Sequence, residues 1–328
     1  MGNLGTHENF PVRPWELVCY LFIGLVGTFG NILVIFVLKR NKTMGATAFG
    51  VYIGALAMAD LLVCLLCVPI YLTSTSLYKD HPTGNLGDAM CKIFTGYNIL
   101  FFFATVSVYT LVVLTHERYM AICKPFKSRL KSTKKRAIVF VIMIWVFSVL
   151  LGSLSIVGEK YAAPTNASVG AHCTFSNAYN NDITPKVVYV TVFSIQFVLP
   201  IIYMTVCFIR IKHCLDAKRL HALSCPTEHV QQGELHLIKI RQQSINTVMI
   251  VIISYFSCWA MNQVLYFCLN FGFISGIEWN SHLIQASVIL CFFSSCINPF
   301  IYTIRSHHFR SGFSQILCVS DRRYIELQ

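Results

Sequence analysis

The chain has 328 residues, of which 55% are hydrophobic and only 12% are charged, and its mean hydropathy is +0.60. These values lie far outside the range of soluble globular domains and leave no room for a separate soluble domain. No nucleophile and base can be placed together in one cavity, so enzymatic chemistry is not expected.

Seven stretches carry no charge or almost none, and each is at least about 20 residues long, enough to cross a bilayer as a helix. We therefore predict an all-α membrane protein, a seven-transmembrane helix bundle that occupies residues 15–304. The predicted spans are about 15–39, 46–71, 92–122, 137–158, 186–211, 240–269 and 282–304.

Lysine and arginine are concentrated on one side of these spans, where the loops and the tail hold 21 of the 26. The positive-inside rule then places residues 1–14 outside the cell and the tail in the cytoplasm of a multi-pass plasma-membrane protein. The net charge of +12 reflects this topology and the anionic inner leaflet, so nucleic acid is not expected as a partner. The opposite side has a net charge of −2.

The outer loops hold two further features. Cys91 and Cys173 lie there, where an oxidising compartment allows them to bridge, whereas most of the 14 cysteines lie in apolar runs and are expected to pack as small hydrophobes. Asn166 begins an Asn-Ala-Ser glycosylation acceptor on the same side.

Several polar residues are expected deep in the membrane. Asp60 is the only acid well inside a span, and such a carboxylate should be protonated, paired or bound to a cation. Ser107 lies three helical turns before Arg118, at a similar depth, and Asn31, Ser295 and Asn298 complete an oxygen-rich set. This set suits a small hard cation, and plain helix–helix hydrogen bonding explains it equally well.

The third span ends in a charged group, Glu117-Arg118-Tyr119, for which a snorkelling arginine at the lipid boundary is the simpler interpretation. Pro200 and Pro299 should break the fifth and seventh helices. After the last span, residues 305–318 form an amphipathic pattern that predicts a short interfacial helix, followed by a cytoplasmic tail at 319–328. Cys318, at the end of that helix, is a candidate for palmitoylation or a free thiol.

One motif falls in each span, in order: Gly30-Asn31, Leu56-Ala57-Met58-Ala59-Asp60, Glu117-Arg118-Tyr119, Trp145, Pro200, Cys258-Trp259 and Asn298-Pro299-Phe300-Ile301-Tyr302. In this arrangement the chain, from about Trp15 to Cys318, resembles the rhodopsin-like (class A) G-protein-coupled receptors. Its slightly acidic outer face, its long second outer loop and Pro69 in the second span look most like the peptide-receptor branch.

The resemblance implies roles for individual residues. Arg118 would be held by Glu117 at rest and turn to a heterotrimeric G protein on activation, with Tyr119 and Arg241 in the coupling region. A sodium ion would bind as an allosteric ligand among Asp60, Ser107, Asn31, Ser295 and Asn298, and no other cofactor is implied. Cys91 and Cys173 would form the outer disulfide, and the activation relay would comprise Pro200, Trp259, Asn298, Pro299 and Tyr302.

The chain also departs from the family pattern. Met261 replaces the proline after Cys-Trp, and Phe208 stands where a tyrosine is common. Cys91 lies about two residues further from Arg118 than usual, and no acid occurs between Leu237 and Ile250 to bind Arg118. These departures put the energetics of activation in question, but not the fold.

The ligand cavity is expected to be apolar and aromatic with neutral amides, a composition typical of ligand pockets. Leu100 occupies the position of the amine receptors' aspartate, and Phe292 that of the opsins' lysine, so neither a monoamine nor retinal is expected. The predicted lining residues are Tyr97, Leu100, Phe101, Ala104, Gln196, Trp259, Asn262, Gln263, Tyr266, Gln285 and Phe292.

A neutral or mildly basic neuropeptide is the favoured ligand, because the outer face is slightly acidic and a long second outer loop is present. A lipid or another small apolar ligand is the alternative. A seven-span transporter is a more remote one, since it would carry paired acids or inverted repeats at mid-membrane. Arrestin and membrane lipids are the other partners to expect.

Overall fold

The computed structural model describes residues 12–73, 75, 77, 82, 84–126, 128, 133–157, 159–161, 175–177, 183–224, 228–274 and 281–305. Several predictions lie outside these ranges: the glycosylation site at Asn166, the cysteine Cys173, and the interfacial helix beyond Arg305 with Cys318 and the tail.

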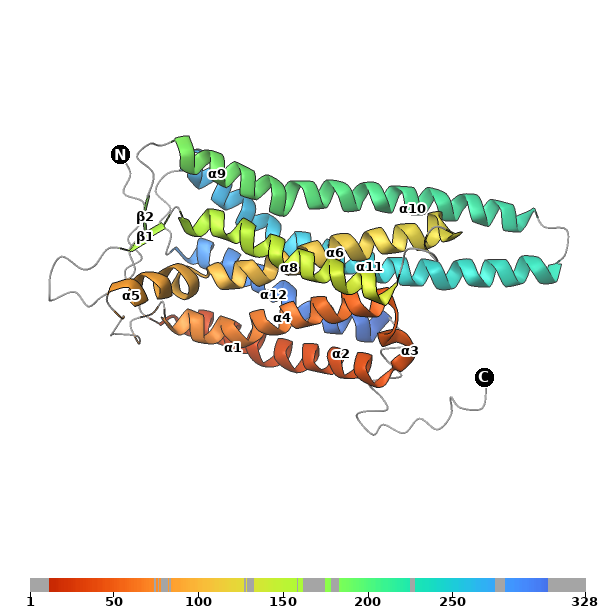
Figure 1. Ribbon diagram of the computed structural model, residues 1–328, viewed down its shortest axis with the longest axis horizontal. Coiled ribbons are helices and arrows are strands. Elements are labelled where there is room, and N and C mark those ends of the chain that lie inside the picture. The colour runs from red at the N-terminus through yellow and green to blue at the C-terminus, as the bar shows by residue number, and fades with distance from the viewer. Residues whose placement is uncertain are drawn as a thin grey trace.

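Within the described ranges, seven helical segments are long and apolar enough to cross a membrane, and they run side by side as one elongated bundle (Figure 1). These segments are Pro14–Arg40, Ala48–Thr73, Asn98–Cys123, Lys134–Leu154, Lys186–Leu223, Gln231–Asn270 and His282–Arg305. The predicted seven-helix membrane bundle is therefore confirmed.

The first membrane helix consists of α1 (Pro14–Phe22), the π-helical turn η1 (Ile23–Gly27) and α2 (Thr28–Arg40), and the short α3 (Lys42–Gly45) follows it. The other helices and turns, in chain order, are α4 (Ala48–Thr73), α5 (Gly84–Met90), the π turn η2 (Cys91–Thr95), α6 (Asn98–Cys123), α8 (Lys134–Val157), α9 (Ile183–Phe193), the π turn η3 (Ser194–Val198), α10 (Leu199–Leu223), α11 (Glu228–Asn270) and α12 (His282–Arg305).

A small hairpin lies at the same end of the bundle as α5, which is the predicted extracellular end (Figure 1). Its strands are β1 (Glu159–Tyr161) and β2 (Phe175–Asn177), and they pair antiparallel with Lys160 opposite Ser176. The all-α prediction missed this hairpin, because three-residue strands are too short to show a sequence period.

Helix α6 lies at the centre of the bundle and packs against α4, α8 and α10. Its buried side chains, such as Leu111 and Leu114, join a core that includes Leu56 of α4 and Val251 of α11. Large apolar side chains point outward elsewhere, and Leu25 is 71% exposed. Since these outward faces are apolar, lipid is the solvent that they fit.

Glycines allow the first membrane helix to approach its neighbours closely. A Cβ atom on Gly30 would lie 2.9 Å from Cβ and Cγ of Pro299, and one on Gly27 would lie 2.3 Å from Sγ of Cys64. Both distances are too short for real Cβ contacts. Glycine at position 30 therefore lets its neighbour, Asn31, reach α12.

The third membrane helix differs from the prediction of one continuous span from residue 92. The π turn η2 ends at Thr95, and Tyr97 adopts a left-handed conformation with φ of 61° before α6 begins at Asn98. The Asn98 side chain donates a hydrogen bond of 2.7 Å to the carbonyl oxygen of Lys92 across this break. The break takes up extra chain between Cys91 and Arg118, which the sequence shows as unusual spacing.

The helices α10 and α11 extend further than the rest of the bundle at the end opposite the hairpin (Figure 1). Helix α11 runs without interruption for 43 residues, as expected for a segment that has Met261 in place of a proline.

Candidate functional site

A buried carboxylate at Asp60 connects three helices in the middle of the bundle. The hydroxyl of Ser107 on α6 donates a hydrogen bond of 2.9 Å to its Oδ1, and the amide of Asn298 on α12 donates one of 2.7 Å to its Oδ2. Asp60 is 1% exposed. A carboxylate at such a place needs these donors, because water does not reach it.

Asn31 joins this cluster through the backbone of α12. Its amide nitrogen donates to the carbonyl oxygens of Gly27, at 2.9 Å, and of Ser295, at 3.0 Å. In an α-helix the carbonyl of Ser295 would accept from residue 299, but Pro299 has no N–H. Asn31 therefore supplies the donor that the proline removes.

The same residues offer oxygen ligands to a cation. The cluster offers the carboxylate of Asp60 and the hydroxyl of Ser107, and Oδ1 of Asn31 is buried without a hydrogen-bond partner among the described residues. Ser295 is buried beside them. Oxygen atoms of these kinds are the ligands that small hard cations prefer, so the donor set fits such an ion.

Part of the predicted ligand cavity is a continuous group of aromatic rings. Phe101 of α6 lies edge-on to Trp259 of α11, with ring centroids 5.9 Å apart, and 5.6 Å from Phe292 of α12. Tyr97 stacks on the other side of Phe292 at 6.3 Å, and Tyr255 stacks beneath Trp259 at 5.3 Å. The rings therefore connect α6, α11 and α12.

Two predicted amides of this cavity are held by neighbouring helices. Gln196 donates a hydrogen bond of 2.9 Å to the hydroxyl of Thr105, and Asn262 donates one of 3.0 Å to the hydroxyl of Ser287. The sequence analysis missed both hydroxyl partners, because serine and threonine in a membrane helix usually bond to their own backbone.

Two other polar atoms of the cavity are buried and lack a hydrogen-bond partner within the described part of the chain. They are Nε1 of Trp259, a donor, and Oε1 of Gln285, an acceptor. Buried polar atoms are normally satisfied, so each of these two atoms marks a place where a ligand or water with hydrogen-bonding groups can be held.

The remaining predicted cavity residues divide into two groups. Leu100 and Ala104 are fully buried on α6, in the two clusters that contain the aromatic rings. The backbone carbonyl of Gln263 accepts a hydrogen bond of 3.3 Å from Tyr189 of α9, and Tyr266 lies one turn further along α11. These two residues therefore belong to the side of α11 that faces α9.

Pro200 is the second residue of α10, which follows the π turn η3. In a π turn residue 200 would donate to the carbonyl of Ile195, and proline cannot. The hydroxyl of Tyr109 on α6 donates to that carbonyl instead, at 2.7 Å. The predicted break in the fifth span is thus a π turn whose free carbonyl is bound by a neighbouring helix.

The inner end of α6 places Arg118 against an aromatic ring. Its guanidinium carbon lies 3.6 Å from the ring centroid of Phe49, near the start of α4. No ion pair within the described residues involves Arg118, and the neighbouring Glu117 acts on the guanidinium through its charge, so its role in restraining Arg118 stays a prediction. Lys124 lies 5.6 Å over the ring of Tyr119, and the side chain of Arg241 on α11 is exposed.

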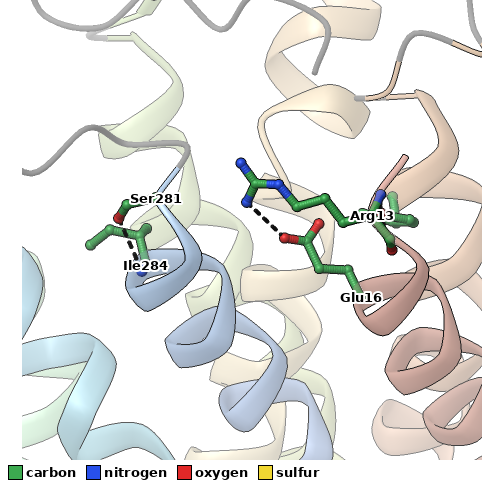
Figure 2. A network of polar contacts seen from close by, with 5 residues as sticks. Arg13, Glu16, Ser281 and Ile284 are labelled. Carbon is green, nitrogen blue, oxygen red and sulfur yellow. Dashed lines mark hydrogen bonds and ion pairs between the residues drawn. The ribbon is translucent and has the colours of Figure 1, made fainter. Parts of the chain in front are cut away.

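The predicted outer end holds an ion pair that the sequence analysis did not single out. Arg13 and Glu16 are joined at 3.0 Å, and the Glu16 side chain is completely buried at the first turn of α1, facing α12 (Figure 2). The backbone N–H of Arg13 also donates to the hydroxyl of Tyr71 on α4, at 3.2 Å. The spacing of three residues between Arg13 and Glu16 is the feature of the sequence that could have predicted this ion pair.

Cys91 is disulfide-bonded. Its predicted partner, Cys173, lies outside the described residues, so the pairing itself stays a prediction.

Seven membrane helices surround a buried carboxylate, a cluster of aromatic rings and, at the inner end, an arginine, which is the arrangement of a seven-helix membrane receptor. The chain belongs to the family described as 7 transmembrane receptor (rhodopsin family), whose model matches residues 30–302. This membership confirms the resemblance drawn from the motifs and makes the protein a signalling receptor rather than an enzyme.

Curated relatives cover almost the whole chain. Neuromedin-U receptor 2 of Homo sapiens is 29% identical, over 96% of this chain and 74% of that receptor. Galanin receptor 2b of Danio rerio is 25% identical, over 98% of this chain and 81% of its own length. Cholecystokinin receptor type A of Cavia porcellus is 28% identical, over 92% of this chain and 81% of its own length.

Proposed function

We propose that this receptor binds an extracellular neuropeptide and activates a heterotrimeric G protein at the opposite end of its bundle. The observation that carries the ligand class is the mixed character of the cavity. Aromatic rings line it, and the unpartnered Nε1 of Trp259 and Oε1 of Gln285 offer one donor and one acceptor. A peptide supplies both an apolar side chain and backbone groups that complement such a pair.

The relatives support the same class, because the proteins that match are named as receptors for neuromedin U, galanin and cholecystokinin. The slightly acidic outer face favours a neutral or mildly basic peptide. The receptor would lie in the plasma membrane with its N-terminus outside, glycosylated at Asn166, with a disulfide between Cys91 and Cys173.

The mechanism follows from the contacts between helices. A ligand that displaces Phe101 or Phe292 also displaces Trp259, since the three rings touch. The next polar connection is the hydrogen bond from Asn298 to Asp60, which links α12 to α4. A ligand shifts the balance between two arrangements of these helices only as far as it binds one better than the other. The shift would free Arg118 for the G protein.

Sodium would bind between these two regions as an allosteric ligand, held by Asp60, Ser107, Asn31, Ser295 and Asn298. Its role would be to stabilise the resting arrangement, because the ion requires Asp60 and its neighbours to stay together. Regulation by arrestin, palmitoylation of Cys318 and contacts with membrane lipids are the remaining parts of this proposal.

The ligand is tested by titrating the purified receptor with neuromedin U, galanin, somatostatin and cholecystokinin peptides and with a panel of lipids. Peptide binding that weakens as salt is raised supports the proposal, because screening removes the attraction of the acidic face. A lipid is the second candidate, favoured by the wholly apolar side chains of Leu100 and Ala104 in the cavity wall. If only lipids bind, with an affinity that does not change with salt, the ligand is a lipid and not a peptide.

Coupling is tested with Arg118→Ala in nucleotide-exchange assays on purified G proteins of each major class. Exchange should be lost while ligand affinity stays within about threefold, because Arg118 lies at the far end of α6 from the cavity. Undiminished exchange in this variant would end the assignment of Arg118 as the coupling residue.

A further inference from the structure

The neighbouring acid Glu117 acts on the charge of Arg118 without forming an ion pair with it within the described residues. The guanidinium Nε is buried without a hydrogen-bond partner within the described part of the chain, and no ion pair there involves this side chain. Helix α11 has no acidic residue between Leu237 and Ile250, the stretch that faces the inner end of the bundle. A buried positive charge requires another source of negative potential.

The ring of Phe49 supplies that potential. The guanidinium carbon of Arg118 lies 3.6 Å from the ring centroid, well inside the distance of about 6 Å at which a cation is attracted to an aromatic face. The ring is partly buried and packs against the main core, so it is shielded from water on its other side. Shielding of this kind strengthens the attraction.

The start of α4 holds Phe49 in place. The hydroxyl of Thr47 accepts a hydrogen bond of 3.0 Å from the N–H of Gly50 and donates one of 2.7 Å to the carbonyl of Met44. A Cβ atom on Gly50 would lie 2.1 Å from that same carbonyl oxygen, so only glycine permits this tight corner between α3 and α4. The corner fixes the direction in which the ring of the intervening residue points.

We propose that Phe49 is the residue that restrains Arg118 in the resting receptor, in the role for which α11 offers no acid between Leu237 and Ile250. The inference rests on the proposed coupling through Arg118, and it makes Phe49 a positioning residue that acts on the coupling residue. Activation then requires the guanidinium to leave the ring face. Loss of the ring should raise ligand-free nucleotide exchange about two- to fivefold, the change expected for a cation–π contact.

The first experiment replaces Phe49 with mono-, di- and trifluorophenylalanine by site-specific incorporation. Fluorine withdraws electron density from the ring face and changes its size little, so the attraction weakens stepwise while the fold is kept. The apparent Tm of the purified receptor should fall stepwise, by about 2 °C in all, and ligand-free exchange should rise in the same order. The same series at the outward-facing Phe29, 63% exposed, is the control and should change neither quantity.

The second experiment repeats the Phe49 series with Arg118→Met. Without the cation, fluorination of Phe49 should no longer lower the apparent Tm. Equal slopes in the two backgrounds, or a flat series with Arg118 present, would overturn the inference. The Tm measurement requires neither ligand nor G protein. If exchange survives in Arg118→Ala, the coupling proposal fails, while the Tm series still shows whether Phe49 holds the guanidinium.

Discussion

The side chain of Asn31 donates a hydrogen bond of 3.0 Å to the carbonyl oxygen of Ser295, which Pro299 leaves without its helical donor. In the same way, the hydroxyl of Tyr109 donates a hydrogen bond of 2.7 Å to the carbonyl oxygen of Ile195, which Pro200 leaves without a donor. Pro200 follows the π turn of the fifth span, whereas Pro299 lies inside the continuous helix α12, so the break predicted there is not formed. At both prolines a polar side chain from a neighbouring helix binds the freed carbonyl. Such a contact ties two helices together, so their movements are coupled.

Replacing Asn31 with leucine should destabilise the receptor by about 1–3 kcal/mol, because the buried carbonyl of Ser295 loses its donor. The apparent Tm of the purified protein measures the loss. Leucine has the branching and the number of side-chain heavy atoms of asparagine but is bulkier, so the variant alone combines the loss of the hydrogen bonds with a change in packing.

Pro299→Ala provides the matched background, since alanine restores the N–H that can donate to Ser295. In that background Asn31→Leu should lower the Tm clearly less than it does in the wild type. Equal losses in both backgrounds would show that Asn31 stabilises the fold in another way, for example through its bond to Gly27.

The sequence was sufficient to predict the seven helices and the meeting of Asp60, Ser107 and Asn298 at one depth. Both follow from local rules: apolar runs of membrane length, and the regular rise of a helix that fixes the depth of Ser107 from Arg118. The family motifs added which helix carries which polar residue.

Contacts that depend on how two helices are rotated against each other were not predictable in this way. Phe49 and Arg118 are far apart in the chain. Taken alone, the sequence around each residue gives no sign that the other lies beside it. The break at Tyr97 was visible only as unusual spacing between Cys91 and Arg118. Its form, a π turn followed by a left-handed residue, depends on packing around Tyr97, Phe292 and Asn98.

The receptor's stability should depend on the ion pair between Arg13 and Glu16. The reason is the burial of Glu16, and not a strong attraction within the pair. Arg13→Ala leaves a carboxylate with no exposed surface and no cation, which should cost about 3–5 kcal/mol. Adding Glu16→Gln to Arg13→Ala should recover most of the lost Tm, because the amide carries no charge.

The pair formed by Lys92 and Asp88 is the control. It has a similar length of 2.9 Å, but its side chains are 23% and 41% exposed. Lys92→Ala should therefore change stability by less than about 0.5 kcal/mol. If Arg13→Ala is as mild as Lys92→Ala, the burial of Glu16 is not what makes its partner necessary.

Sodium should stabilise the ligand-free receptor through Asp60. Replacing the organic cation N-methyl-D-glucamine by sodium at constant ionic strength should raise the apparent Tm. At a sodium concentration ten times its dissociation constant, the free energy of unfolding should rise by about 1.4 kcal/mol. Asp60→Asn should remove this difference, whereas the exposed acid variant Asp88→Asn should retain it. A Tm that responds equally in wild type and Asp60→Asn would mean that the ion acts elsewhere. With an agonist in hand, sodium should also lower its affinity, since linkage is reciprocal.

Met261→Pro should raise ligand-free nucleotide exchange at least about twofold. Position 261 lies within the uninterrupted α11, two residues after Trp259, and a proline there removes a backbone hydrogen bond and introduces a kink. A kinked helix can swing its inner half with less disturbance of the packed outer half, so the active arrangement should become easier to reach. Met261→Ala is the control, because it shortens the side chain and keeps the backbone donor. Exchange is compared at matched amounts of receptor, and equal rates for the proline and alanine variants would show that the straightness of α11 does not set the basal activity.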